Sequence, residues 1–440
     1  MAILPQKALF EWDSIEDIGD LVRLQFVFDN LPDEPLMQAL ESHRGRGRND
    51  YPIRAIWNSI LAGVVFTHET IESLRRELQR NAQLRALCGF DPLLGSRAVP
   101  PSSVYSRFLY VLIDHQHLID QLFNQLVAEY GSLHQDFGKV LAIDGKALPS
   151  YAPGEKKNGG DTEDHRGEHD AKWGKHEYKG VDEKGGAWKT VKSWFGFTLH
   201  LVVDADHELP VGYEITDASA NEMPVAHRVL DCVASDSPWL IDRCEYLCAD
   251  RGLDDGKLLA GAWDRYQIKP VIAIRNCWQD GDETRLVPGS ENVVYDFKGT
   301  VKCVCPQTGK QRDMAYGGFE KERNSHKYRC PARHYGYPCR GMKACPITHS
   351  IRIPLSTDRR VFTPLARSTY KWERVYDKRT AVERVNSRLD TCFGFEHHTI
   401  RGLQKMHFRV SLSFCVMLAM AIGWTKNERP ELVRCLLKAG

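Results

Sequence analysis

Apolar residues recur at helical spacing through the first third of the chain. In residues 51–66 (YPIRAIWNSILAGVVF) and 68–90 they stand three and four positions apart, and basic residues separate them in the second run. The sequence AVPPSS at 98–103 interrupts this pattern, and a further helical pattern follows over 104–130. The spacing predicts an all-helical N-terminal domain over residues 1–135.

The pattern changes after residue 135, where short apolar runs end in acidic or turn-forming residues. Such runs are typical of buried strands. Strands are predicted at 138–148, 194–204, 209–219, 244–250 and 269–275. Helices are predicted at 221–235, 254–266 (with Asp254 as cap) and 372–390. The polar, glycine-bearing residues 151–190 predict mainly a long loop. This order of elements predicts an α/β fold.

The α/β pattern is interrupted once. Residues 276–355 are rich in cysteine, glycine and basic residues and show little periodicity. We therefore expect an α/β core in two parts, 136–275 and 356–440, separated by a cysteine-rich insertion at 276–355. The second part of the core is expected to consist of C-terminal helices.

Composition narrows the possible classes. The 440 residues are 42% hydrophobic and 27% charged, values that are ordinary for a globular protein. Lys and Arg number 59 against 58 Asp and Glu, so any DNA-binding surface must come from local patches. Residues 361–410 carry such an excess, and RGRGR at 44–48 is another basic run. The longest apolar stretch, 410–424, is short for a membrane span, and the start lacks a secretory pattern. We expect no membrane association and a cytoplasmic, nucleoid-associated location.

Three acidic residues occupy positions where a ligand is expected. Asp144 and Asp250 end predicted strands, and Glu383 lies on the helix after the insertion. Ligands of open α/β sheets gather at the carboxyl ends of strands. Carboxylates are the ligands that Mg²⁺ prefers, and a pair of such ions can promote phosphodiester chemistry. Acids are also common at strand ends simply because loops are polar. Four neighbouring acids are read as turn or cap residues: Asp204, Asp206, Asp254 and Asp255.

The helix that carries Glu383 strengthens the case for a site. Tyr376, Arg379 and Glu383 are spaced three and four apart and share one helix face. The guanidinium group suits phosphate because it can donate two parallel hydrogen bonds. The alternative is a solvated face with an ordinary Arg–Glu pair.

These motifs resemble a known family. Asp144-Gly145, Asp250-Arg251-Gly252 and Tyr376-x2-Arg379-x3-Glu383 together resemble the signature of bacterial insertion-sequence DDE transposases. Residues 194–221 resemble the segment between the two aspartates of that family, and 51–110 resembles the helical domain that precedes its catalytic domain. The resemblance therefore implies that the N-terminal domain, residues 1–135, binds DNA.

The resemblance implies an RNase H-like mixed sheet with flanking helices. It implies Mg²⁺- or Mn²⁺-dependent cleavage and joining of phosphodiester bonds at transposon ends, with Asp144, Asp250 and Glu383 as the metal ligands. Tyr376 and Arg379 would contact DNA near the scissile phosphate. The partners would be double-stranded DNA, namely terminal inverted repeats and target DNA, and a second copy of the chain in the active complex.

One departure from the family concerns a phosphate contact. Many relatives place a lysine seven residues after the glutamate, where this chain has Asp390. Arg388 or Lys405 are the residues considered to supply the missing charge, and Arg388 is included among the expected DNA contacts.

The insertion has the composition of a zinc module. Five of the thirteen cysteines follow the pattern C-x-C-x24-C-x8-C-x5-C. Four thiolates can hold Zn²⁺ tetrahedrally. The preferred structural ligands are Cys305, Cys330, Cys339 and Cys345, with Cys303 as a spare. Free thiols are the alternative. Five histidines are further possible metal ligands: His165, His169, His176, His326 and His334.

The leading hypothesis is thus a DDE transposase. Three alternatives stay open: a catalytically inactive or domesticated DNA-binding protein, another RNase H-like nuclease, and a glycoside hydrolase with paired carboxylates. A glycine-rich nucleotide loop of the form GxxxxGK[ST] is absent from the sequence, so ATP is not implied.

Overall fold

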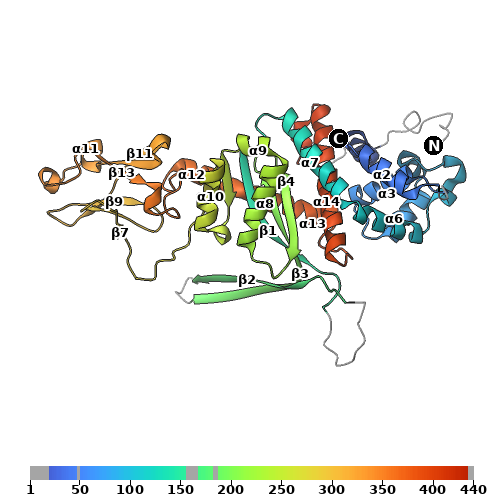
Figure 1. Ribbon diagram of the computed structural model, residues 1–440, viewed down its shortest axis with the longest axis horizontal. Coiled ribbons are helices and arrows are strands. Elements are labelled where there is room, and N and C mark those ends of the chain that lie inside the picture. Colours follow the sequence, from blue (N-terminus) through green and yellow to red (C-terminus); the bar gives the residue numbers. More distant parts are fainter. Residues whose placement is uncertain (1–18, 47–49, 155–166, 182–186, 435–440) are drawn as a thin grey trace, which may run out of the picture.

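The computed structural model describes residues 19–46, 50–154, 167–181 and 187–434. The molecule is elongated, with N-terminal helices at one end, a mixed sheet in the middle and a strand-rich segment at the other end (Figure 1). The prediction of a mixed α/β protein with a helical N-terminal region is confirmed.

The helical region contains seven α-helices in its described part. They are α1 (Val22–Asn30), α2 (Glu34–Arg44), α3 (Ile53–Val65), α4 (Ile71–Arg80), α5 (Ala82–Cys88), α6 (Ser102–Asp114) and α7 (Gln116–Leu133). Local signals define several ends. Thr70 and Ser73 form a reciprocal capping box at the start of α4. Asn81 both ends α4 and caps α5 by accepting the Leu84 N–H at 2.9 Å.

The central sheet has six strands. They are β1 (Val140–Pro149), β2 (Lys172–Val181), β3 (Ala187–Asp204), β4 (Leu209–Asp217), β5 (Tyr246–Ala249) and β6 (Lys269–Ile272). Their order is β2-β3-β1-β5-β6, and β4 also pairs with β3. β3 is antiparallel to β1 and β4, whereas β1, β5 and β6 run parallel. β1 is therefore the strand where the antiparallel and parallel halves of the sheet meet.

The helices of the core cover this sheet. They are α8 (Glu222–Asp236), α9 (Pro238–Arg243), α10 (Gly256–Tyr266), α12 (Tyr370–Tyr376), α13 (Thr380–Phe393) and α14 (Leu403–Lys426). α8 packs on β3 and β4, and α13 packs on β1 and β3. A 3-10 turn, η8 (Asp377–Arg379), joins α12 to α13, so the predicted helix at 372–390 forms as a nearly continuous rod.

α14 is the longest helix of the described chain. By length and composition alone it could cross a membrane, and 89% of its apolar window is buried within the protein. It packs against α7, α1 and β4. The apolar surface of α14 is therefore part of the hydrophobic core, as the short apolar stretch at 410–424 predicts.

The predicted loop at 151–190 is wrong over much of its length. β2 pairs with the first half of β3 from Lys172↔Gly196 to Val181↔Ala187, whereas the second half of β3 lies between β1 and β4. The paired strands project from the sheet as a two-stranded ribbon (Figure 1). Because much of the ribbon is exposed, its strands need no alternating apolar pattern and escape sequence recognition. Residues 155–166, which include His165, lie outside the described residues.

The strand-rich segment between β6 and α12 has its own small core. Its strands are β7 (Arg285–Leu286), β8 (Val293–Tyr295), β9 (Val301–Val304), β10 (Gln311–Asp313), β11 (Ala315–Glu320), β12 (Ser325–Arg329) and β13 (Ser350–Pro354), accompanied by α11 (Pro331–Tyr335). They form sheets of four and three strands. Buried residues such as Val293, Tyr328 and Ile353 form a hydrophobic cluster separate from the main core.

Candidate active site

Two acids of the site come from neighbouring parallel strands. Ile143 of β1 pairs with Ala249 of β5, so Asp144 and Asp250 each follow the same rung of the sheet. Asp250 lies just beyond the end of β5, and its Oδ1 accepts the N–H of Gly252 at 2.6 Å. Register alone therefore brings these two carboxylates together.

Burial and neighbouring negative charges raise the pKa of Asp144. Burial raises the pKa of its carboxyl group to about 7, and the charges of Asp250, Glu222 and Glu383 act in the same direction. The N–H of Gly145, which donates to Asp144 Oδ1 at 2.8 Å, offsets this only in part. The structure thus brings Asp250 and Glu383 close enough to Asp144 for their charges to act on it, although 106 and 133 residues separate the three acids along the chain.

Glu222 is a fourth carboxylate of this cluster, and the sequence did not reveal it. It occupies the first turn of α8, after the Asn221 cap, where an acid is expected simply from the helix dipole. Burial raises the pKa of Glu222, and Asp250 adds to this while His176 opposes it. His176 Nε2 lies 3.6 Å from Glu222 Oε1. The only signal in the sequence is an acid in the first turn of a predicted helix, and that signal is too common to be useful.

His176 brings the ribbon to the edge of the acid cluster. Its ring stacks on Trp194 across the β2–β3 pair, with centroids 5.0 Å apart. The sequence predicts His176 only as part of a polar loop that contains several histidines. Its position in a strand beside Glu222 instead makes it a neighbour of the four carboxylates.

Arg379 and Tyr376 lie where their spacing predicts. Arg379 Nη1 donates to Glu383 Oε1 at 2.7 Å, and its guanidinium lies 5.3 Å from the centre of the Tyr376 ring. The Tyr376 ring in turn stacks on Trp372 at 4.8 Å. An acid of the cluster therefore stands beside a partly exposed arginine that is held over an aromatic platform.

Arg388 does not lie with these residues, so its predicted role as a DNA contact is corrected. Its side chain is 10% exposed and its Nη2 donates to Glu208 Oε2 at 2.7 Å. The buried stripe of α13 includes Arg388 alongside Val385 and Leu389. An arginine in this position holds α13 to the β3–β4 turn and is not available to DNA.

The departure at Asp390 has a structural explanation. Lys146 of β1, two residues after Asp144, donates its Nζ to Asp390 Oδ2 at 2.6 Å. Alternate residues of a strand face the same side, so Lys146 shares a side with Asp144. The positive charge next to the cluster thus comes from β1, and Asp390 of α13 is its partner.

Asp254 also differs from its predicted role. Asp255, not Asp254, caps α10 by accepting the Leu258 N–H at 2.9 Å. Asp254 is buried and pairs with Arg360, whose Nη2 lies 2.5 Å from Asp254 Oδ2. This pair links the end of β5 to the chain that returns from the strand-rich segment.

The five clustered cysteines line one cavity of about 570 Å³. They are Cys303, Cys305, Cys330, Cys339 and Cys345. Hydrogen bonds from Thr308 and the N–H of Gln307 lower the pKa of Cys305 to about 6, which favours the thiolate form. Among the described residues, no three of these sulfur atoms lie within 4.8 Å of one another. The expected thiols therefore line one cavity, and their sulfur atoms would have to move closer to one another to bind zinc.

Four carboxylates lie beside an arginine here: one within β1, one just beyond β5 and two on helices. Carboxylate oxygens are the ligands that hard divalent cations prefer. The family described as Transposase DDE domain matches residues 135–419. The chain therefore belongs to the DDE transposases. No curated protein matches this sequence. Among solved structures, a cryo-EM structure of the piggyBac transposase synaptic complex with hairpin DNA is similar at 11% identity and a TM-score of 0.39, covering 95% of this chain and 79% of that one.

The raised pKa of Asp144 predicts a stability effect. In the unfolded chain an aspartate titrates near pH 4, roughly three units below the folded value of about 7. The folded protein therefore loses stability as pH rises from about 4 to 7, because ionisation is harder in the cluster. Without added metal, Asp144→Asn should raise the free energy of unfolding at pH 8 by on the order of 2–4 kcal/mol, and by much less near pH 4.

Thermal unfolding of the two proteins at several pH values measures this difference. Asp242→Asn, an exposed position on α9, is the matched control and should change little at any pH. An Asp144→Asn protein that is no more stable than wild type at pH 8 would contradict the account of the cluster.

Proposed function

We propose that this protein is an insertion-sequence transposase that cleaves and joins phosphodiester bonds at the ends of its element. The observation that supports this proposal is the clustering of Asp250, Glu383 and Glu222 around Asp144. The order of the sheet, with an antiparallel half and a parallel half that meet at β1, supports an RNase H-like core. We expect it to act on DNA in the cytoplasm, with two copies of the chain pairing two DNA ends.

The carboxylates fit a pair of Mg²⁺ or Mn²⁺ ions. They are oxygen ligands, and their mutual repulsion is what a bound cation relieves. Two such ions would activate the attacking hydroxyl and stabilise the leaving oxygen of the phosphodiester. Asp144, Asp250 and Glu383 would hold them, and Glu222 would complete the negative cluster.

The remaining residues of the site orient the DNA. Arg379 is placed to donate to a phosphate oxygen while Tyr376 supports its guanidinium. Lys146 adds positive charge on the Asp144 side of β1 and, with Asp390, fixes α13 against the sheet. His176 stands next to Glu222 and limits how far that carboxylate can turn.

The test of this function is DNA-end cleavage. Purified protein is incubated with Mg²⁺ and a labelled duplex that carries the DNA flanking its own gene. Site-specific nicking that leaves a 3′-hydroxyl supports the proposal. Specific binding without cleavage under Mg²⁺ or Mn²⁺ would favour the inactive DNA-binding protein, and cleavage without sequence preference would favour another nuclease.

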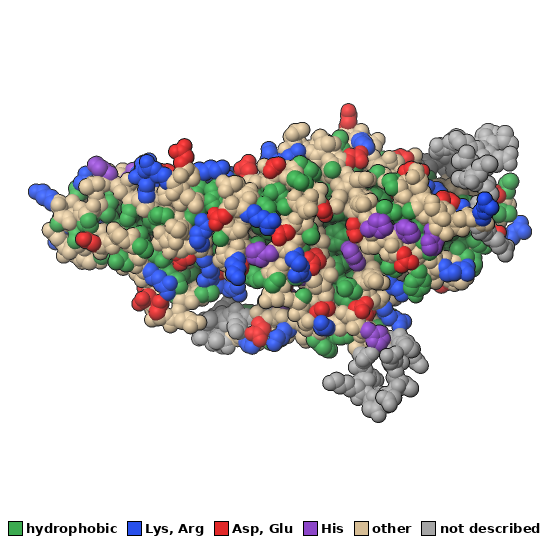
Figure 2. All heavy atoms as spheres, in the orientation of Figure 1, with side chains coloured by type: hydrophobic (Ala, Val, Ile, Leu, Met, Phe, Trp, Pro, Cys, Tyr) green, Lys and Arg blue, Asp and Glu red, His purple; other side chains and the backbone are tan. Residues whose placement is uncertain are grey.

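The ribbon is the surface that we expect to guide DNA into the site. On the face shown in Figure 2, basic and acidic side chains are interspersed, so charge alone marks no groove there. Strand pairing places Lys192 and Trp188 on the side of the ribbon that also carries His176. Trp188 is 46% exposed, which leaves its ring free to stack on a base. Lys175 and Trp173 lie on the opposite side and provide a matched comparison.

The double variant Lys192→Glu, Trp188→Ala should weaken DNA binding by on the order of 10-fold or more, because it removes a phosphate contact and a stacking surface. Its binding constant should also depend less steeply on salt. Fluorescence anisotropy over a salt series measures both effects. Lys175→Glu, Trp173→Ala should bind within about twofold of wild type. Equal loss in both variants would mean that the ribbon does not present one side to DNA.

A further inference from the structure

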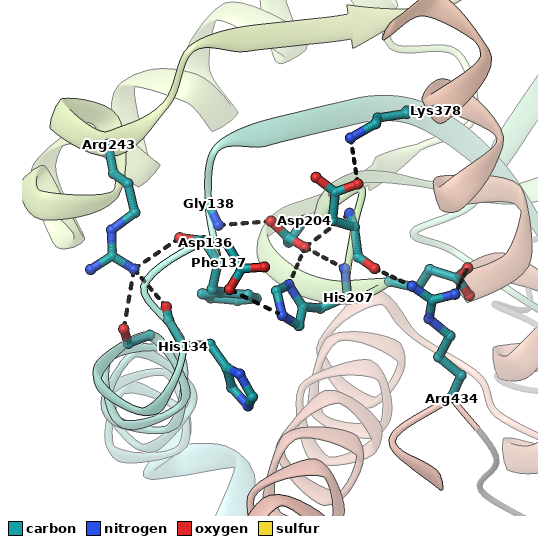
Figure 3. Close-up of polar contacts among 12 residues, drawn as sticks. His134, Asp136, Phe137, Gly138, Asp204, His207, Arg243, Lys378 and Arg434 are labelled. Atoms are coloured by element: carbon teal, nitrogen blue, oxygen red, sulfur yellow. Dashed lines mark hydrogen bonds and ion pairs between the residues drawn. The ribbon is translucent and has the colours of Figure 1, made fainter. Parts of the chain in front are cut away.

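A second group of potential metal ligands lies outside the carboxylate cluster. His134 and Asp136 stand in the loop between α7 and β1, and His207 stands in the turn between β3 and β4 (Figure 3). One potential ligand atom from each of the three lies within 4.8 Å of the other two. His207 Nε2 is 3.8 Å from Asp136 Oδ1, and the rings of His134 and His207 are 5.1 Å apart.

A buried carboxylate orients one of these histidines. Asp204 is fully buried, and its Oδ1 lies 2.9 Å from His207 Nδ1. The same carboxylate accepts the N–H groups of Asp206 at 3.0 Å and Gly138 at 2.7 Å, which ties the two loops together. Because this carboxylate holds Nδ1, the other ring nitrogen of His207, Nε2, faces Asp136. Histidines that a carboxylate orients in this way are typical metal ligands.

The backbone around the group is also fixed. Arg243 Nη1 donates to three carbonyl oxygens, that of Gly131 in the last turn of α7 and those of His134 and Phe137 in the loop that follows, at 3.1, 3.0 and 2.9 Å. Figure 3 shows this arginine on one side of the loop and the histidine pair on the other. Because the loop is held from behind, His134 and Asp136 are presented to His207 by a pre-organised backbone.

We propose that His134, Asp136 and His207 form a binding site for a divalent transition-metal ion of the Zn²⁺ class. Two imidazoles and one carboxylate are ligands that such ions accept, whereas Mg²⁺ prefers oxygen ligands alone. Tetrahedral bonds of about 2.0–2.2 Å place ligand atoms roughly 3.3–3.6 Å apart, so the 3.8 Å between His207 and Asp136 needs only a small adjustment. Three protein ligands leave one position for water or a further donor.

The bound ion would connect the helical region to the catalytic helices. Next to the site, Asp206 Oδ1 accepts Lys378 Nζ of η8 at 2.5 Å, and Arg379 with its partner Glu383 follows directly. Arg434 of the C-terminal segment donates to the Asp206 carbonyl oxygen and lies near Glu208. An ion bound by residues of both the α7–β1 loop and the β3–β4 turn would hold these two segments together. It would therefore stabilise the turn whose Asp206 pairs with Lys378 of η8.

Cobalt titration of the full-length protein tests the site. Excess Mg²⁺ occupies the carboxylate cluster, and cobalt bound by thiolates is recognised by its charge-transfer absorption. The proposed site should give one equivalent of cobalt with d–d absorption and no thiolate band. Asp136→Asn should weaken this binding by about tenfold or more. Asp136 is 61% exposed, so this change should not disturb folding. His207→Gln should abolish the binding, and Asp136→His, which keeps a ligand, should retain it.

A matched control uses another histidine–aspartate pair. His227 Nε2 lies 3.5 Å from Asp255 Oδ2 but belongs to no three-ligand group among the described residues. His227→Gln should bind cobalt as wild type does, and Zn²⁺ should raise the melting temperature of both. If Asp136→Asn and His207→Gln keep the full wild-type stoichiometry and affinity, the proposal is overturned. Cleavage activity plays no part in this readout, so the result is independent of the proposed function.

Discussion

Glu383→Gln is expected to abolish DNA-end cleavage while leaving the fold and DNA binding intact. The change removes a negative charge from the cluster but keeps the side-chain shape and a hydrogen-bond acceptor for Arg379. Loss of a ligand to a catalytic metal removes several kcal/mol of transition-state stabilisation, which corresponds to on the order of 10³-fold in rate or more. Asp250→Asn should have an effect of the same size, because Asp250 ends the strand next to Asp144.

The variant Glu222→Gln tests what the fourth carboxylate contributes to cleavage. If Glu222 only adds to the negative potential, Glu222→Gln should reduce cleavage by on the order of 10- to 100-fold, the usual effect of a group that supports metal ligands. Glu396→Gln, an exposed acid just after α13, is the control and should cleave as wild type does. Single-turnover rates on a labelled end duplex, with binding measured in parallel, distinguish these outcomes. Full activity of Glu383→Gln or Asp250→Asn would remove that residue from the site.

The parts of this site that the sequence predicts are those governed by local pattern. The strands that carry Asp144 and Asp250 are buried on the parallel side of the sheet, so they appear as continuous apolar runs. Glu383 stands in a helix with a clear apolar stripe, and its spacing from Arg379 fixes their shared face. Local periodicity thus predicts both the secondary-structure elements and the polar residues of the site that these elements carry.

The features that the sequence does not predict depend on tertiary pairing. The ribbon strand at Lys172–Val181 is polar because it projects into solvent, and its pairing with β3 is visible only in three dimensions. Arg388 looks like a surface cation, yet Glu208 meets it from a turn 180 residues away. Glu222 joins the acids only because α8 returns across β3 and β4. In each case the partner, and not the residue itself, decides the role.

Zinc binding by the cysteine cavity leads to the second large expected effect. The strand-rich segment has strands of two to six residues and a small separate core, and short domains of this kind usually need a metal or disulfides for stability. We propose that Cys305, Cys330, Cys339 and Cys345 hold structural Zn²⁺, with Cys303 as a further thiol that lines the same cavity. Structural zinc contributes about 10 kcal/mol or more to the folding of small metal-dependent domains.

Removing this ion should unfold the strand-rich segment while the central sheet stays folded, since the two hydrophobic clusters are separate. Limited proteolysis with and without a zinc chelator should show new cuts within residues 276–355 only after chelation. Cys339→Ser should behave as the chelated protein does, because its thiol lies at the cavity beside Cys305. Cys277→Ser, an exposed cysteine outside the cavity, should remain resistant. A Cys339→Ser protein with wild-type zinc content and protease resistance would show that the thiols serve only to fill space, because a site with a missing ligand cannot retain both.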